Sequence, residues 1–319
     1  MAGALIIRIG FQKRGGAVIS TTINKYCYIS CRYLPPFFQS KHRVIWSHIE
    51  LVSTLNEILH PAVREGLKFL GFTDKTGMEI HYQGDLPART GMGSSSSFAV
   101  GLLKALHALK GQMISKHELG LQAIELEQKI LKENVGCQDQ VAAAYGGFNL
   151  IQFNPNGSIQ VEPITIAEER LENLQERLLL FYTGTSRIAS QVAGELIANV
   201  GKNKETLRKM RAMVNQALTI LSDHEDLDHF GDLLNESWQY KRSLSSSISN
   251  LTIDNIYELA MKNGALGGKL LGAGASGFMV FYAPVETHEG IKEALKGYLQ
   301  VPFRFEFDGS SIIHYRPNE

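Results

Sequence analysis

The stretch Asp85-Leu86-Pro87-Ala88-Arg89-Thr90-Gly91-Met92-Gly93-Ser94-Ser95-Ser96-Ser97 is followed at once by a segment with helical periodicity. Apolar residues that mark one helix face recur there: Phe98, Leu102, Ala105, Leu106 and Leu109. Glycines let backbone N–H groups turn toward a ligand, and the N-terminus of a helix favours anions. The stretch therefore predicts a loop that binds phosphate.

This loop differs from the common P-loop, because no Lys-Ser or Lys-Thr pair follows its glycines at the required spacing. A serine N-cap beside a flexible loop would explain the same residues without any ligand. Other features of the chain have to decide between the two interpretations.

The composition is that of an ordinary globular chain of 319 residues, 44% hydrophobic and 20% charged, with a formal net charge of zero. The length fits two domains or one large one. Neutrality gives no electrostatic argument for a nucleic acid or a membrane as partner. Short apolar runs and the lack of a signal peptide predict a cytoplasmic protein. Three cysteines without C-x-x-C or metal-ligand spacing predict a reducing compartment and no structural zinc.

Strand and helix signals alternate along the chain. Strands are predicted at Ala4–Arg8, Ala17–Arg32 (two strands or one bent strand), Met78–Tyr82, Phe148–Phe153, Ser158–Ile166, Leu178–Thr183 and Phe278–Tyr282. Helices are predicted at Leu51–Leu70, from the capping box at Ser115 to about Asn134, at Asp139–Tyr145, in long stretches up to Ile248, and at Ile253–Lys262. A domain boundary near 165–176 would divide the chain into residues 1–170 and 171–319.

Glu127 lies on the apolar face of the helix that follows Ser115, together with Ala123, Ile124 and Ile130. An ionised carboxylate on a buried face is unfavourable without a cation or other partner. Either a metal ion or a salt bridge to an arginine at the edge of the core would satisfy it.

Asp139 begins a short helix twelve residues after Glu127. An aspartate at that position is commonly only a helix cap. It could also accept or orient the proton of a substrate hydroxyl. Two carboxylates near a phosphate-binding loop suit magnesium-dependent phosphoryl transfer, in which one holds the cation and the other addresses the nucleophile.

The segment Gly272-Ala273-Gly274-Ala275-Ser276-Gly277 matches the G-x-G-x-x-G fingerprint of dinucleotide-binding proteins. That fingerprint requires a helix after the glycines, whereas Phe278–Tyr282 is predicted to form a strand. The glycines therefore indicate a loop between strands that approaches a ligand or the other domain, or a plain turn. No G-x-S-x-G or H-E-x-x-H motif is present, so the sequence gives no support for a hydrolase triad or a zinc peptidase.

Taken together, these segments resemble the GHMP small-molecule kinases. Pro87-x-x-x-Gly91-Met92-Gly93-Ser94-Ser95 resembles their second motif, and Lys269 to Phe278 resembles their third. The bacterial D-glycero-D-manno-heptose 7-phosphate kinases are the most similar subfamily, through Tyr26–Pro36, Asp85–Leu103, Glu133–Asn149, Thr183–Ser190 and Trp238–Asn250.

The resemblance implies an α+β fold. Its N-terminal ATP-binding domain would be similar to ribosomal protein S5 domain 2, and its C-terminal domain ferredoxin-like, with the site in the cleft between them. ATP and Mg²⁺ are the implied cofactors. The implied nucleotide-binding residues are Pro87, Arg89, Gly91, Met92, Gly93, Ser94, Ser95, Ser96, Gly272, Gly274, Ala275 and Ser276.

The resemblance also implies individual roles. Ser95 and Glu127 would be magnesium ligands, Asp139 would receive or orient the proton of the acceptor hydroxyl, and Arg8 would assist it. The implied reaction transfers the γ-phosphoryl group of ATP to the anomeric hydroxyl of heptose 7-phosphate, in nucleotide-activated heptose synthesis. Arg187, Lys241 and Arg242 are candidates for binding the sugar phosphate.

Two departures from the family pattern stand out. Ala275 and Ser276 occupy positions where the third motif usually has glycines, which should stiffen the loop. A sugar-contacting Gly-Gly-Thr-Asp stretch is expected after Gly10, where Phe11 follows directly. Either the loop is deleted or the printed sequence omits it, and a Cα–Cα distance well above about 3.8 Å from Gly10 to Phe11 would show an omission.

Two further hypotheses remain open. One is a related sugar-1-kinase that acts on a neutral sugar such as fucose or galactose. The other is a non-catalytic regulator that binds a sugar and a nucleotide. The partner is in each case a small molecule, and the chain is expected to be a monomer or a homodimer.

Overall fold

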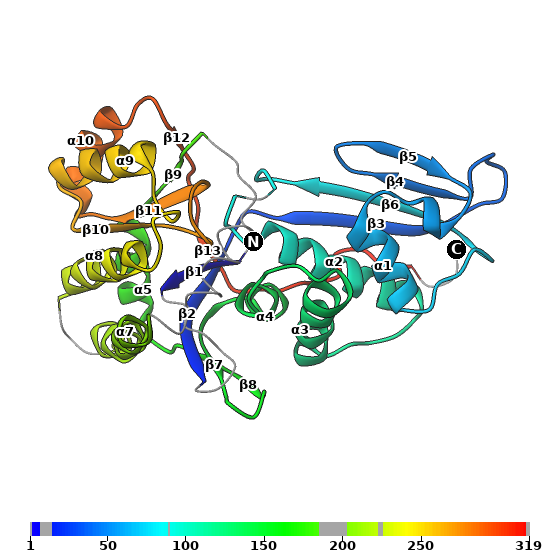
Figure 1. Cartoon of the computed structure of the whole chain (residues 1–319), viewed down its shortest axis with the longest axis horizontal. Helices are drawn as coiled ribbons and strands as arrows, with labels where there is room; N and C mark the ends of the chain where they lie inside the picture. Colours follow the sequence, from blue (N-terminus) through cyan, green and yellow to red (C-terminus); the bar gives the residue numbers. More distant parts are fainter. Residues whose placement is uncertain (1, 7–14, 89, 185–202, 223–225, 317–319) are drawn as a thin grey trace.

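The computed structural model describes residues 2–6, 15–88, 90–184, 203–222 and 226–316. Two groups of sheets and helices lie side by side along the long axis of the molecule (Figure 1). Within the described residues, no helix is both long and apolar enough to cross a bilayer.

The N-terminal domain contains two sheets. The first is antiparallel, in the order β1 (Ala2–Ile6), β2 (Gly16–Ile23), β7 (Phe148–Phe153) and β8 (Ile159–Pro163). The second has the order β3 (Cys27–Leu34), β6 (Gly77–Gly84), β4 (His42–Ile45) and β5 (Ile49–Val52), with β4 and β6 parallel.

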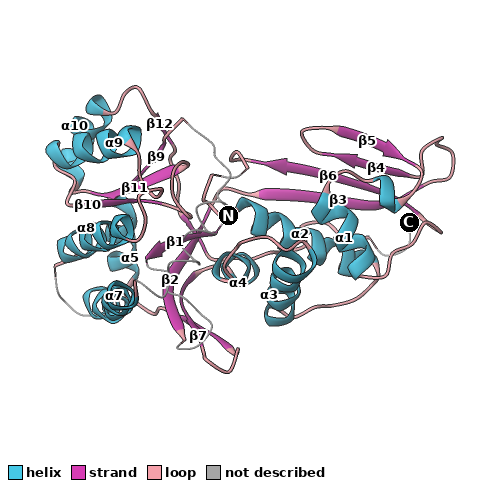
Figure 2. Cartoon of the chain, viewed as in Figure 1, coloured by secondary structure: helices cyan, strands magenta, loops and turns pink. Residues whose placement is uncertain are grey.

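Four helices accompany these sheets: α1 (Pro61–Phe69), α2 (Ser94–Leu109), α3 (Lys116–Ile124) and α4 (Gln138–Tyr145). Helices α1 and α2 lie along one side of the second sheet, whereas α3 and α4 pack against α2 and the first sheet (Figure 2). Helix α2 is the helix that the sequence predicts after the serine run, and its apolar side packs against β3 and α1. It thereby directs its N-terminus toward the C-terminal domain (Figure 1).

The C-terminal domain is built on an antiparallel sheet in the order β10 (Gly267–Leu270), β11 (Phe278–Tyr282), β9 (Leu178–Tyr182) and β12 (Leu299–Gln300). The helices α5 (Glu168–Glu176), α7 (Lys204–Ser222) and α8 (Asp228–Ser243) contribute to the apolar cluster on one face. The helices α9 (Leu251–Lys262) and α10 (His288–Ala294) contribute to the cluster on the other.

One apolar core is continuous between the two domains. Ile23 and Met92 from the N-terminal domain belong to the same cluster as Leu180, Leu271 and Val280 from the C-terminal domain. The loops that contain Met92 and Leu271 are therefore packed on the same core, one from each domain.

The end of the chain returns to the N-terminal domain. Strand β13 (Phe305–Glu306) pairs with β2, and the backbone N–H of Ser310 donates to the carbonyl of Ala143 on α4. The last segment thus contacts both the first sheet and the C-terminal turn of α4.

Several local predictions are confirmed. Ser115 and Glu118 form a capping box at the start of α3, and the strand β11 directly follows the glycines, so residues 272–277 are not a dinucleotide fingerprint. The segment Ala17–Arg32 forms the two strands β2 and β3 rather than one bent strand.

Two helix predictions are wrong in part. The helix predicted over Leu51–Leu70 exists only at Pro61–Phe69, since Leu51 belongs to β5 and a 3₁₀ turn follows at Leu55–Glu57. The helix expected to reach Asn134 changes to a π-helical segment, Glu125–Ile130, and ends there. Widened π-helical turns are frequent at functional sites.

Candidate functional site

Residues 90–93 form the first glycine loop, which leads into α2. Gly91 and Gly93 have φ angles of 78° and 67°, in the left-handed region, and Gly93 is the residue that precedes the helix. Glycine adopts this conformation more easily than any other residue. Both glycines thus come directly before the first turn of α2, whose N–H groups have no partner within the helix. This geometry suits an anion, as the sequence predicts.

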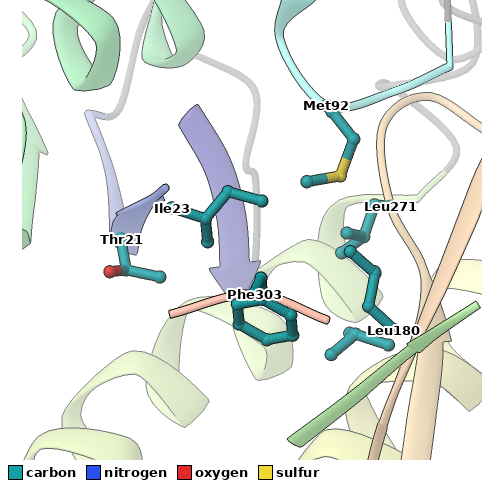
Figure 3. A pocket seen from close by; sticks show the side chains of 7 residues that line it. Thr21, Ile23, Met92, Leu180, Leu271 and Phe303 are labelled. Atoms are coloured by element: carbon teal, nitrogen blue, oxygen red, sulfur yellow. The ribbon is translucent and has the colours of Figure 1, made fainter. Parts of the chain in front are cut away.

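Met92 anchors the first glycine loop on the core between the domains. Its side chain is buried and points into a small apolar pocket that Ile23, Leu271 and Phe303 also line (Figure 3). The side chain of Met92 thus holds the loop on the C-terminal domain, and its contribution to a nucleotide site would come from its backbone.

Glu127 is the centre of a buried hydrogen-bond network. Its side chain is 1% exposed. Ser95 Oγ donates to Oε1 at 2.7 Å and Ser96 Oγ donates to Oε2 at 2.8 Å. Gln140 Nε2 also donates to Oε2. The prediction that Glu127 lies on a buried face is confirmed, and its described hydrogen-bond donors are two hydroxyls and an amide rather than an arginine.

Burial raises the pKa of Glu127 above its ordinary value, because desolvation outweighs the three hydrogen bonds that favour the ionised form. Such a carboxylate is stabilised further by a cation. Among the described residues, no cluster of three or more His, Cys, Asp and Glu side chains could hold a metal ion. A carboxylate and a hydroxyl suit Mg²⁺, which is usually held by one or two carboxylates together with substrate phosphates. The oxygens of Ser95 and Glu127 therefore fit this ion.

We expect Glu127→Gln to raise the Mg²⁺ concentration for half-maximal activity by about tenfold or more. The folded-state pKa of Glu127 is raised, so the free energy of unfolding decreases as the pH rises from the ordinary carboxyl pKa to the raised one, and the ionised carboxylate opposes folding above that range. The metal-free variant should therefore be at least as stable as the wild type at neutral pH. Denaturant unfolding in a chelator and rates across a magnesium series measure the two quantities.

Glu79 provides a matched control on β6, since it is also buried and accepts hydrogen bonds from Arg32 and Arg43. Burial raises its pKa, but His81 and the two arginines outweigh burial and the pKa is lowered. Glu79→Gln should therefore reduce stability at neutral pH without changing the magnesium requirement. If the two variants had the same magnesium curve as the wild type, Glu127 would not be a ligand.

Helix α4 carries both Asp139 and Gln140, and Gln140 belongs to this network. Asp139 lies in the first turn and is partly exposed, and Gln138 Nε2 donates to its Oδ1 at 3.2 Å. Cys137, not Asp139, occupies the N-cap position. The next residue, Gln140, is fully buried and contacts Glu127, so Asp139 is one residue from the side chain that joins α4 to the serines of α2.

Residues 271–277 form the second glycine loop, which meets the first glycine loop backbone to backbone. A Cβ added to Gly272 would lie 2.4 Å from Gly91 Cα, and one added to Gly277 would lie 2.1 Å from the carbonyl oxygen of Thr90. No side chain fits between the loops at these positions. The two segments that the resemblance assigns to the nucleotide thus lie in direct contact.

The second glycine loop is held by backbone and side-chain hydrogen bonds. The N–H of Ala275 donates to the Ile248 carbonyl, and Asn250 Nδ2 donates to the Ala275 carbonyl. Thr183 exchanges hydrogen bonds with both backbone groups of Gly277. Ala275 has a φ angle of 67°, a left-handed conformation that is strained in any residue with a Cβ. Ala275 and Ser276 are both buried, as is Gly274.

Other residues singled out in the sequence have varied positions. Arg8, Arg89, Arg187 and the Gly10–Phe11 junction lie outside the described residues. Lys241 Nζ donates to the carbonyls of Leu270 and Gly272. Arg242 pairs with Asp254 at 2.9 Å. The cationic groups of Lys241 and Arg242, which the sequence offered as candidates for the sugar phosphate, thus bind acceptor groups of this chain.

Gln140 is the site residue that sequence reasoning missed. A signal was present, because Gln138 and Gln140 are polar side chains in a short helix that continues as Val-Ala-Ala-Ala and is therefore buried. Buried amides need hydrogen-bond partners. The sequence alone did not show that the partner would be Glu127.

Comparison with known proteins assigns the family. Models described as the GHMP kinases N-terminal domain and the GHMP kinases C-terminal domain match residues 56–147 and 211–298. A D-glycero-alpha-D-manno-heptose 7-phosphate kinase of Campylobacter jejuni is 33% identical over 75% of this chain and 71% of its own length.

Solved structures show the same fold. A D-glycero-D-manno-heptose 1-phosphate kinase from Bacteroides thetaiotaomicron has a TM-score of 0.68 at 23% identity, covering 92% of this chain and 89% of its own. The mevalonate kinase of Methanococcus jannaschii has a TM-score of 0.71 at 19% identity, covering 96% of each chain. With both family domains matched and the two glycine loops in contact, the chain belongs to the GHMP kinases and is an ATP-dependent kinase.

Proposed function

We propose that this protein is a sugar kinase that transfers the γ-phosphoryl group of ATP to the anomeric hydroxyl of D-glycero-D-manno-heptose 7-phosphate, with Mg²⁺. The observation that carries the proposal is the network around Glu127, which joins the serines at the start of α2 to the helix that bears Asp139. The similarity to the C. jejuni kinase supports the choice of sugar.

In this proposal the two glycine loops bind the phosphates of ATP. The N–H groups at the start of α2 and the residues Gly91 to Ser95 would contact the phosphates on one side, and Gly272 to Ser276 would line the other. Mg²⁺, held by Ser95 and Glu127, would reduce the negative charge of the phosphates.

Asp139 is proposed to act on the acceptor. The anomeric oxygen attacks the γ-phosphorus, the bond from that phosphorus to the bridging oxygen breaks, ADP leaves, and the hydroxyl proton passes to a carboxylate oxygen of Asp139. Gln138 and Gln140 flank Asp139 and fix the first turn of α4. Arg8 is proposed to assist this residue.

We also propose a boundary near residue 170 between the ATP-binding and C-terminal domains.

The test is ADP release from the full chain with ATP and Mg²⁺ across heptose 7-phosphate, the unphosphorylated heptose, galactose, fucose and hexose phosphates. The phosphorylated heptose should be preferred over its neutral form by on the order of tenfold to several hundredfold, the usual reach of an anion site built from Arg or Lys. Phosphorus NMR of the product should show a new anomeric phosphate.

Two results would contradict the proposal in different ways. Equal or better use of a neutral hexose would indicate a fucose- or galactose-type sugar-1-kinase. Binding of ATP and sugar without ADP release would indicate a non-catalytic sugar-binding regulator.

A further inference from the structure

Lys241 is a cation whose two described hydrogen bonds both go to the second glycine loop and the strand end that leads into it. It lies in the last turn of α8, and its Nζ donates to the carbonyl of Leu270 and to that of Gly272, both at 2.7 Å. Its ammonium also lies 5.8 Å from the centre of the Trp238 ring. Trp238 is fully buried, so the position of Lys241 is set by the core of the C-terminal domain.

These two contacts fix the direction of the loop's peptide groups. In a trans peptide the C=O and the N–H point in opposite directions. The Gly272 carbonyl points to Lys241 on α8, so the N–H of Ala273 points to the side away from α8. The N–H of Leu271, which faces away from the Leu270 carbonyl, is already used in a hydrogen bond to the Phe278 carbonyl.

The rim of the loop at Gly272 and Ala273 is open to a ligand. Gly272 is exposed and Ala273 is partly exposed, whereas residues 274–277 are buried. Gly272 also abuts Gly91, so a displacement of this peptide would disturb the first glycine loop directly. Lys241 therefore orients the peptide group between Gly272 and Ala273, beside the contact between the two loops.

We propose that Lys241 is a positioning residue for nucleotide binding, which acts through the Gly272 peptide to present the Ala273 N–H to an ATP phosphate. This inference rests on the proposed placement of ATP between the two glycine loops and deepens it. It assigns Lys241 a role different from binding the sugar phosphate.

The experiment compares Lys241→Met with wild type by calorimetric titration of ATP and of adenosine in Mg²⁺, and by steady-state kinetics. We expect the Kd and KM for ATP to rise about tenfold or more, since a charge-assisted pair of hydrogen bonds is lost. The Kd for adenosine and the KM for the sugar should change less than about twofold. Lys241→Arg, which can donate to both carbonyls, should recover most of the ATP affinity.

Lys110→Met is the matched control. Lys110 Nζ also donates to a backbone carbonyl, that of Leu70, at 2.7 Å, and lies 5.5 Å from the centre of the Phe72 ring. It is at the far end of α2 from the first glycine loop. The variant should bind ATP as the wild type does.

An unchanged ATP affinity in Lys241→Met would overturn the inference, as would an equal loss for ATP and adenosine. If Lys241→Met did not fold, the same comparison of ATP and adenosine affinity would be made with Lys241→Gln, whose side chain is shorter and uncharged. A selective loss of ATP affinity in that variant would support the inference, and its absence would overturn it. Failure of the proposed function is a separate result, because it appears in the wild type as a lack of transfer to heptose 7-phosphate.

Discussion

Asp139→Asn should lower kcat by about a hundredfold or more, the usual scale for the loss of a positioned proton acceptor. The amide cannot take the hydroxyl proton but keeps the size of the side chain. Because Asp139 is in the first turn of α4 and is not the N-cap, the substitution should change the free energy of unfolding by less than about 1 kcal/mol. Initial rates and denaturant unfolding of the same preparation measure both.

Glu168→Gln is the control for the helix-dipole effect, since Glu168 is an exposed acid in the first turn of α5. It should leave kcat unchanged. ATP titration of Asp139→Asn should give the wild-type affinity. A variant with normal kcat and reduced stability would make Asp139 a structural residue of α4, and the proton acceptor would have to be sought elsewhere.

Gly272→Ala should raise the KM for ATP by about tenfold or more and reduce stability. The added Cβ would lie 2.4 Å from Gly91 Cα, which is backbone and cannot rotate away as a side chain would. One glycine loop must therefore be displaced from the other. Kinetics with ATP as the varied substrate, together with thermal unfolding, would show the effect.

Gly71→Ala separates crowding from backbone strain. Gly71 has a φ of 73°, close to the 70° of Gly272, but a Cβ there would meet nothing within 4 Å. Both substitutions impose the left-handed penalty of about 1–2 kcal/mol on stability. Only Gly272→Ala should affect the KM for ATP. Equal behaviour of the two variants would mean that the contact between the loops has no role in nucleotide binding.

Local signals explain how much of the site could be predicted. The turn at Gly91 and Gly93 into α2, the buried face that carries Glu127, and the start of α4 each depend on a few adjacent residues. The contacts of Glu127 with Ser95 and Gln140 join residues 32 and 13 positions away, and periodicity carries no information about them. The same holds for the contact between Gly91 and Gly272.

Sheet patterning explains the main error of the fold prediction. In β5, Ile49 and Leu51 are exposed while Glu50 is buried, where its carboxylate accepts hydrogen bonds from Trp46 Nε1 and the N–H groups of Leu59 and His60. The usual apolar-in, polar-out alternation is therefore reversed in this four-residue strand. The apolar residues from Leu51 into α1 also have a helical spacing, so the sequence predicted a helix where the strand β5 ends.

The return of β13 to β2 has a consequence for biosynthesis. The side-chain hydroxyl of Thr22 in β2 donates a hydrogen bond to the backbone carbonyl of Glu306 in β13, 284 positions along the chain. The N-terminal sheet cannot be completed until residues 305 and 306 have left the ribosome, and the Ala143 carbonyl of α4 cannot accept its hydrogen bond until Ser310 has done so. Pairings of such high sequence separation form late and slowly. The helix that carries Asp139 would thus gain its hydrogen bond from Ser310 only after the segment that forms the C-terminal domain has been synthesised.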